Sequence, residues 1–308
     1  MTSKPEEMGS EPTECSGPHY SFLGLPVGER AFSNSRAVIL PVPYDGTTTY
    51  RSGTREGPRA ILQASKELEF FDEETCTEAY REGIATLGEL EVTVVSPIDM
   101  VERVRRAGEF LLKQHKLPVL IGGEHLLSLG MIQALVERCK DLTILHLDAH
   151  ADLRENYQGS AYSNACVMYQ AMQIVPLVQA GIRSLTREEN DLIKARNIPC
   201  FFAHQLAQEQ NRWDEIVHCL GPEVYISIDL DVFDPSCMPA VGTPEPGGMS
   251  WWEILALLRR VVMHRKVVGF DVMELLPIPH LVAPDFLAAR LIYKLLSYIF
   301  LDKKPTDC

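Results

Sequence analysis

Three residues with metal-binding side chains follow one apolar segment of the sequence. Asp148, His150 and Asp152 alternate directly after the run Leu142–Leu147. In an extended chain, residues i, i+2 and i+4 point to the same side, so we expect all three side chains to face one site. Buried carboxylates are costly without a positive partner, and divalent metal ions neutralise them most directly. The spacing therefore predicts a metal site at the end of this segment.

Two further groups of the same residue types follow other apolar segments. Asp229 and Asp231 stand at the end of the run Val224–Ile228, and His125 follows two glycines after Pro118–Ile121. Taken alone, His125 is explained as a turn residue and the aspartates as helix caps. Together with the first group, they predict a shared site.

The charges of these residues indicate how many metal ions the site holds. The four carboxylates carry four negative charges, which two divalent ions balance, and two neutral imidazoles complete the ligands. Imidazole and carboxylate donors suit a metal such as Mn²⁺, and two such ions can activate a water between them. His146 is expected to be a buried supporting residue, because six ligands suffice. The predicted ligands are His125, Asp148, His150, Asp152, Asp229 and Asp231.

The rest of the chain alternates between strand-like and helix-like patterns. Continuous apolar runs predict strands at Ala37–Val42, Pro118–Ile121, Leu142–Asp148, Pro176–Ala180, Cys200–Ala203, Val224–Asp229 and Lys266–Asp271. Helical spacing predicts helices at Pro97–Lys116, Glu215–Leu220, Trp251–His264 and Ala288–Phe300, and another near Pro58, with N-caps at Asp214 and Ser250. This alternation indicates an α/β fold with a mostly parallel sheet between helices. Ligands bind at the carboxyl ends of such strands, where the predicted ligands stand.

Composition narrows the possible partners and compartments. Residues 1–18 show no periodicity and are expected to form a flexible tail, with residues 19–308 as a single domain. The net charge of −13 argues against nucleic-acid binding, and no apolar run is long enough to span a membrane. Eight cysteines without paired spacing indicate reduced thiols in the cytoplasm.

These motifs resemble the ureohydrolase family, which includes arginases and agmatinases. The resemblance covers roughly residues 36–300 and is closest to agmatinases. It is carried by Gly-Gly-Glu-His at 122–125, Asp-Ala-His-Ala-Asp at 148–152, Ser-Ile-Asp-Leu-Asp-Val-Phe-Asp-Pro at 227–235, the segments 43–53, 57–60 and 241–248, and Gly-Phe-Asp-Val-Met-Glu-Leu-Leu-Pro at 269–277.

The resemblance implies a three-layer αβα sandwich, a binuclear manganese centre and trimers or hexamers. One metal would take His125, Asp148, Asp152 and Asp229; the other would take Asp148, His150, Asp229 and Asp231. Glu274 matches the glutamate that holds a guanidinium group. The implied reaction is hydrolysis of agmatine to putrescine and urea.

Two positions in the predicted substrate pocket leave alternatives open. Asn164 stands where many relatives have a histidine, so the leaving amine's proton must travel through Asp152, the metal-bound water or another group, unless Asn164 reflects a changed substrate. Arg154 favours a carboxylate-bearing substrate if it faces the pocket, and says nothing if it faces solvent or a neighbouring subunit. Guanidinobutyrate, guanidinopropionate and formiminoglutamate are therefore alternative substrates. A catalytically silent family member is a further alternative, supported only by Asn164.

Overall fold

The computed structural model describes residues 20–25, 31–208 and 212–301. The predicted tail at 1–18 lies outside these residues. The strands are β1 Ala37–Val42, β2 Ile84–Thr86, β3 Leu117–Gly122, β4 Leu142–Leu147, β5 Leu177–Ile182, β6 Cys200–Phe202, β7 Glu223–Asp229 and β8 Lys266–Met273. The α-helices are α1 Gly57–Ala64, α2 Pro97–Lys113, α3 Ser128–Val136, α4 Val167–Ala171, α5 Arg187–Arg196, α6 Ala203–Gln208, α7 Trp213–Cys219, α8 Trp251–His264 and α9 Ala283–Phe300.

The strands form one parallel sheet in the order β2-β1-β3-β8-β7-β4-β5-β6. The predicted fold class is confirmed. Strands β3 and β4 follow each other in the chain, yet β8 and β7 lie between them in the sheet. The carboxyl ends of β3, β8, β7 and β4 are therefore neighbours, although their residues are far apart in sequence. This arrangement brings the predicted clusters together.

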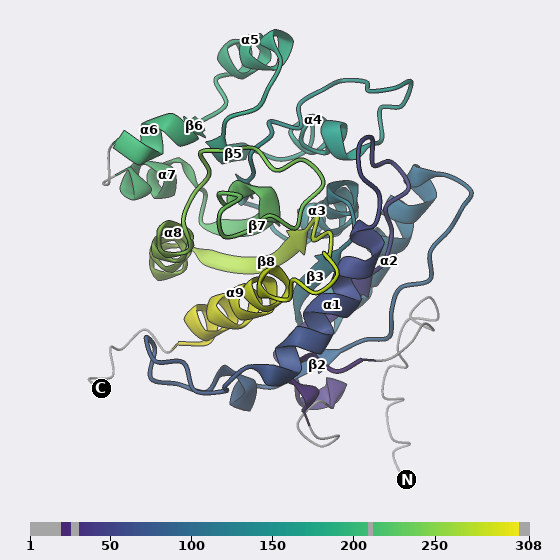
Figure 1. Cartoon of the computed structure of the whole chain (residues 1–308), viewed down its shortest axis with the longest axis vertical. Helices are drawn as coiled ribbons and strands as arrows, with labels where there is room; N and C mark the ends of the chain where they lie inside the picture. Colours follow the sequence, from purple (N-terminus) through teal and green to yellow (C-terminus); the bar gives the residue numbers. More distant parts are fainter. Residues whose placement is uncertain (1–19, 26–30, 209–211, 302–308) are drawn as a thin grey trace, which may run out of the picture.

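Two apolar cores, one on each face of the sheet, explain why the strands are almost wholly apolar. On β1, Ala37 and Ile39 pack into one core, whereas Val38 and Leu40 pack into the other. The first core is completed by α1, α7, α8 and α9, and the second by α2, α3 and α4. Figure 1 shows α1, α8 and α9 in front of the sheet, with α2 and α3 on its far side. These are the three predicted layers.

The predicted elements are present, some with the predicted bounds, as at Ala37–Val42 and Trp251–His264, and others with ends shifted by up to five residues. The second predicted helix stops at Lys113 because the chain turns through a left-handed conformation at His115 (φ 55°). The last helix starts five residues earlier than predicted, at Ala283, with Pro284 in its first turn. The three-residue strand β2 was too short to give a sequence pattern.

The two predicted N-caps have different outcomes. Ser250 caps α8, since its side chain accepts the backbone N–H of Glu253 and that glutamate's side chain accepts the N–H of Ser250. The prediction for Asp214 was wrong, because α7 begins at Trp213 and Asp214 lies inside the first turn. Its carboxylate pairs with Arg260 instead (2.5 Å).

The structure also bears on the predictions about membrane spans and cysteine thiols. Among the described helices, none has both the length and the apolar character needed to cross a bilayer. Five cysteines, at 139, 166, 200, 219 and 237, are free thiols. The expectation of reduced thiols throughout is wrong for Cys76, which is disulfide-bonded.

Candidate metal centre and substrate pocket

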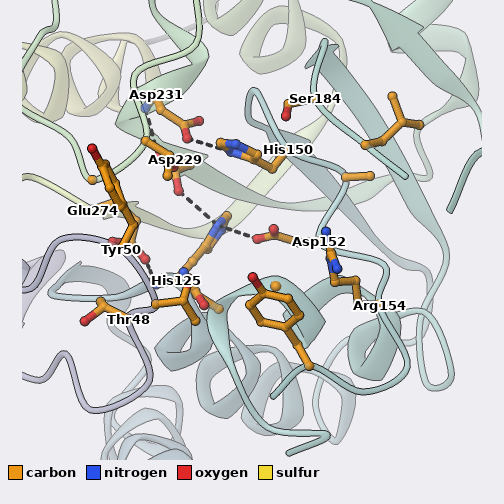
Figure 2. A pocket seen from close by; sticks show the side chains of 18 of the residues that line it. Thr48, Tyr50, His125, His150, Asp152, Arg154, Ser184, Asp229, Asp231 and Glu274 are labelled. Atoms are coloured by element: carbon orange, nitrogen blue, oxygen red, sulfur yellow. Dashed lines mark hydrogen bonds and ion pairs between the residues drawn. The ribbon is translucent and has the colours of Figure 1, made fainter. Parts of the chain in front are cut away.

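A cavity of about 320 Å³ opens where β3, β8, β7 and β4 end. Its wall includes five of the six predicted ligands, together with Glu274, Asn164 and Arg154. Figure 2 shows His125 and His150 pointing toward Asp152, Asp229 and Asp231. The sixth, Asp148, is fully buried beneath them. The fold therefore gathers the predicted site residues in one place.

The first group of side chains converges on the Nδ1 nitrogen of His125. This nitrogen lies 3.1 Å from Oδ2 of Asp148, 3.3 Å from Oδ2 of Asp152 and 3.4 Å from Oδ2 of Asp229. It is buried and makes no hydrogen bond within the described residues. A buried nitrogen facing three carboxylate oxygens fits a divalent cation at their common centre.

The second group lies beside the first and shares Asp148 with it. Nδ1 of His150 is 2.8 Å from Oδ2 of Asp231 and 3.5 Å from Oδ1 of Asp148. The two oxygens of Asp148 thus face different histidines, which is how a carboxylate bridges two metal ions. Asp229 directs Oδ2 toward His125, while its Oδ1 accepts the backbone N–H of Asp231 (2.8 Å).

The local backbone differs from the extended chain expected for residues 148–152. Strand β4 ends at Leu147, and Asp152 adopts a left-handed conformation (φ 53°). His150 still forms a parallel bridge with Ser184, so the departure from the extended course falls at Asp152. As the spacing predicts, the three side chains meet: Asp148 and Asp152 both face His125, and Asp148 also faces His150.

The carboxylates of this cluster repel each other strongly. Burial raises the pKa of Asp229 well above its ordinary value, and the charges of Asp231 and Asp148 raise it further. Burial and the charge of Asp148 together raise the pKa of Asp152 to about 7. Crowded buried acids of this kind are stabilised in their ionised form by nearby cations. The electrostatics and the geometry both fit two divalent metals.

Glu274 lines the cavity next to His125. It follows β8 in a left-handed conformation (φ 65°), and its Oε1 accepts the backbone N–H of His125 (2.7 Å). Burial and the neighbouring Glu124 raise its pKa well above the ordinary value. A buried carboxylate that lines the cavity is suited to a cationic ligand.

Asn164 and Arg154 line the outer part of the same cavity. The side-chain oxygen of Asn164 is buried and has no hydrogen-bond partner among the described residues. The guanidinium of Arg154 stacks over the ring of Tyr157, 4.5 Å from its centroid. Arg154 therefore belongs to the pocket wall, where the aromatic ring holds it.

Several lining residues were not predicted from the sequence, and four of them lie on one loop. Thr48–Arg51 form part of the cavity wall. The buried carboxylate of Glu124 holds this loop by accepting the backbone N–H (2.6 Å) and the hydroxyl (2.7 Å) of Thr47. Glu124 belongs to the Gly-Gly-Glu-His motif and directly precedes the predicted ligand His125. A charged residue at that position was the sequence signal that could have indicated its role in the cavity. Other missed residues of the wall include Ser184, Glu189 and Thr243.

The fold and the cluster define a class of protein: an α/β enzyme with paired histidine–carboxylate clusters at the carboxyl edge of a parallel sheet. The arginase family matches residues 35–297. The chain therefore belongs to the arginase family, and the predicted enzyme class, a hydrolase of the ureohydrolase type, is confirmed.

Relatives with assigned names share most of the chain. The N(1)-aminopropylagmatine ureohydrolase of Synechocystis sp. is 37% identical over 276 residues, covering 87% of this chain and 90% of that protein. The agmatinase of Pyrococcus horikoshii is 34% identical and covers 77% and 82%, respectively. The crystal structure of agmatine ureohydrolase from Thermoplasma volcanium superposes with a TM-score of 0.81, at 28% identity, over 89% of this chain and 93% of that one.

Proposed function

We propose that this enzyme hydrolyses the guanidino group of agmatine, giving urea and putrescine, with two Mn²⁺ ions as cofactors. The observation that carries the proposal is the pair of histidine–carboxylate groups sharing Asp148 on the floor of the cavity that Glu274 lines. His125, Asp148, Asp152 and Asp229 would hold one ion, and Asp148, His150, Asp229 and Asp231 the other. Oxygen and imidazole donors support manganese.

The residues around the metals would position the substrate and move its protons. When bound, the two ions would supply a nucleophile at neutral pH by lowering the pKa of a water. The free oxygen of Glu274 binds the guanidinium and aligns its carbon. Asp152, beside His125, holds the proton that the leaving amine requires. The unpartnered oxygen of Asn164 accepts an N–H of the substrate.

The far end of the substrate distinguishes agmatine from the alternatives. Glu189 offers a carboxylate at the rim, and its oxygens accept the backbone N–H groups of Leu153 (3.0 Å) and Thr186 (2.7 Å). Arg154 lines the same cavity, held against Tyr157, and its positive charge is the observation that favours a carboxylate-terminated alternative. N1-aminopropylagmatine is the second candidate, because a relative 37% identical is named for it.

A substrate panel tests this proposal directly. The purified chain, loaded with Mn²⁺, is assayed for urea release from agmatine, N1-aminopropylagmatine, arginine, 4-guanidinobutyrate and 3-guanidinopropionate, and for formamide release from formiminoglutamate. We expect the highest kcat/KM for an amine-terminated substrate. A preference for a carboxylate-terminated substrate would show that Glu189 does not bind the amine end of the substrate. Metal analysis showing fewer than two ions per active chain would overturn the binuclear cofactor.

Self-assembly is a further part of the proposal. The side chains of Trp252, Val282 and Phe286, at the starts of α8 and α9, are 68%, 71% and 41% exposed. Exposed apolar residues of this size support contact with another copy of the chain. We infer a trimer or hexamer, and light scattering after size exclusion would show a monomer if this is wrong. The cytoplasmic location remains a prediction.

A further inference from the structure

A row of polar side chains crosses the sheet directly beneath the metal-binding clusters. Gln179 on β5, His146 on β4, Ser227 on β7 and Asp271 on β8 are register partners in neighbouring parallel strands. All four are completely buried. Polar residues in such positions must be hydrogen-bonded, so their proton arrangement is strongly constrained. We call these four residues the polar row.

Gln179 determines which nitrogen of His146 carries a proton. Its Nε2 lies 2.7 Å from the backbone oxygen of Ala151 and 2.9 Å from Nδ1 of His146. A carbonyl oxygen only accepts, so the nearby amide atom must be the nitrogen donor and the amide cannot be reversed. Its second N–H then donates to His146, which requires a lone pair on Nδ1. His146 is therefore neutral and carries its proton on Nε2.

The protonated nitrogen of His146 faces the carboxylate shared by the two metal-binding groups. Nε2 lies 2.8 Å from Oδ2 of Asp148, to which it donates. The same oxygen is 3.1 Å from Nδ1 of His125, and the two imidazole rings are 5.1 Å apart. By distance alone, either histidine qualifies as a ligand, and the ligand atoms of His146, His125, Asp148 and Asp152 lie within 4.8 Å of one another.

The other end of the polar row gives His125 the opposite role. Oγ of Ser227 lies 3.0 Å from Oδ1 of Asp271 and 2.9 Å from Nε2 of His125. The hydroxyl oxygen of Ser128 lies 3.3 Å from Oγ of Ser227 and is a weaker acceptor than the carboxylate of Asp271. The O–H of Ser227 therefore donates its hydrogen bond to Asp271. Ser227 then accepts the Nε2–H of His125. This leaves the lone pair of Nδ1 facing the carboxylate cluster.

We propose that the polar row makes His146 a hydrogen-bond donor to Asp148 and leaves His125 as the metal ligand of the pair. Gln179 and His146 are then positioning residues that orient the bridging carboxylate. Gln179 also fixes the carbonyl of Ala151, which stands between two predicted ligands. The inference rests on the proposed metal centre and needs no assumption about the substrate.

Nitrogen-15 NMR of the full-length, metal-free chain, with labelled histidine, tests the proton assignment. We expect His146 to show a protonated Nε2 and an unprotonated Nδ1, with the signal assigned by its loss in His146→Gln. In Gln179→Glu, a carboxylate would face Nδ1, and we expect Nδ1 of His146 to become protonated. A wild-type ring protonated on Nδ1, or on both nitrogens, would overturn the proposal.

Manganese titration by calorimetry tests the consequence for the metal site. Gln179→Met preserves side-chain length but removes the donor, and we expect Mn²⁺ affinity to fall about 10- to 100-fold. His146→Gln should still bind two ions at saturation, whereas His125→Gln should not. The control is Gln173→Leu, which removes an exposed glutamine bonded to the carbonyl of Tyr169.

Two results of the titration would count against a positioning role. One is Mn²⁺ affinity within threefold of wild type in folded Gln179→Met. The other is loss of a whole ion in His146→Gln, which would make His146 a ligand. Thermal unfolding checks that each variant is folded, and the wild-type spectrum decides the proton position even if a variant does not fold. None of these measurements uses a substrate, so a failed substrate panel leaves them unaffected.

Discussion

Replacing Glu274 by glutamine isolates the charge that is proposed to bind the guanidinium. Glutamine keeps the shape of the side chain, and its oxygen can still accept the backbone N–H of His125, now 2.7 Å from Oε1. Its amide then presents N–H donors to a guanidinium that has only donors itself. Removing one partner of a buried ion pair costs about 3–5 kcal/mol. At a factor of ten per 1.4 kcal/mol, kcat/KM should fall about 140- to 3,700-fold.

The assay measures urea release from agmatine together with bound metal. Glu274 is not a proposed ligand, so we expect two Mn²⁺ per chain in both wild type and Glu274→Gln. Glu215→Gln on the exposed surface of α7 is the matched control and should keep full activity. If Glu274→Gln retains kcat/KM within threefold of wild type while holding both ions, the assignment of Glu274 to the guanidinium is wrong.

Other perturbations test the ligands, the proton path and the fold. Asp148→Ala removes a ligand from both ions, so metal affinity and activity should each fall more than about 100-fold. The control, Asp191→Ala at an exposed position, should change neither. Full activity of Asp148→Ala would mean that the site is misassigned. Asn164→His should leave metal content unchanged but shift the pH–rate profile, because histidine titrates near neutrality, and an unchanged profile would remove residue 164 from the proton path. In metal-free protein, burial and the charge of Asp148 raise the pKa of Asp152 from its ordinary value of 3.8 to about 7, so the folded chain retains a proton that the unfolded chain has lost. This contribution to stability is fully present below about pH 4 and is lost as pH rises to 7, so Tm in EDTA should fall from about pH 4 to 7 and then level off, with a smaller fall in Asp152→Asn; an equal slope in both proteins would contradict this. Ser250→Ala removes the cap of α8 and should cost about 1 kcal/mol in urea unfolding, and no loss would show that the capping bond is not formed in solution.

The clustering of the candidate metal ligands was predictable because its signal is local. Each group follows an apolar run, and parallel strands present their carboxyl ends at one edge of a sheet. The sequence could not specify the path after the strand: Asp152 depends on a left-handed turn that a pattern of alternating residues does not reveal. The cap at Ser250 was predictable from its capping box, whereas Asp214 pairs with Arg260, a partner 46 residues away.

Six candidate metal ligands, their charge balance and the motifs of the arginase family can all be identified from the amino-acid sequence alone. Tertiary structure decided which of these groups meet, because β8 and β7 lie between β3 and β4 in the sheet. It also separated the roles of His125 and His146. Both are buried histidines near the same carboxylate, and only hydrogen bonds from neighbouring strands determine which nitrogen carries the proton. Those contacts join residues that are distant in sequence, so they cannot be predicted from the local pattern of residue types.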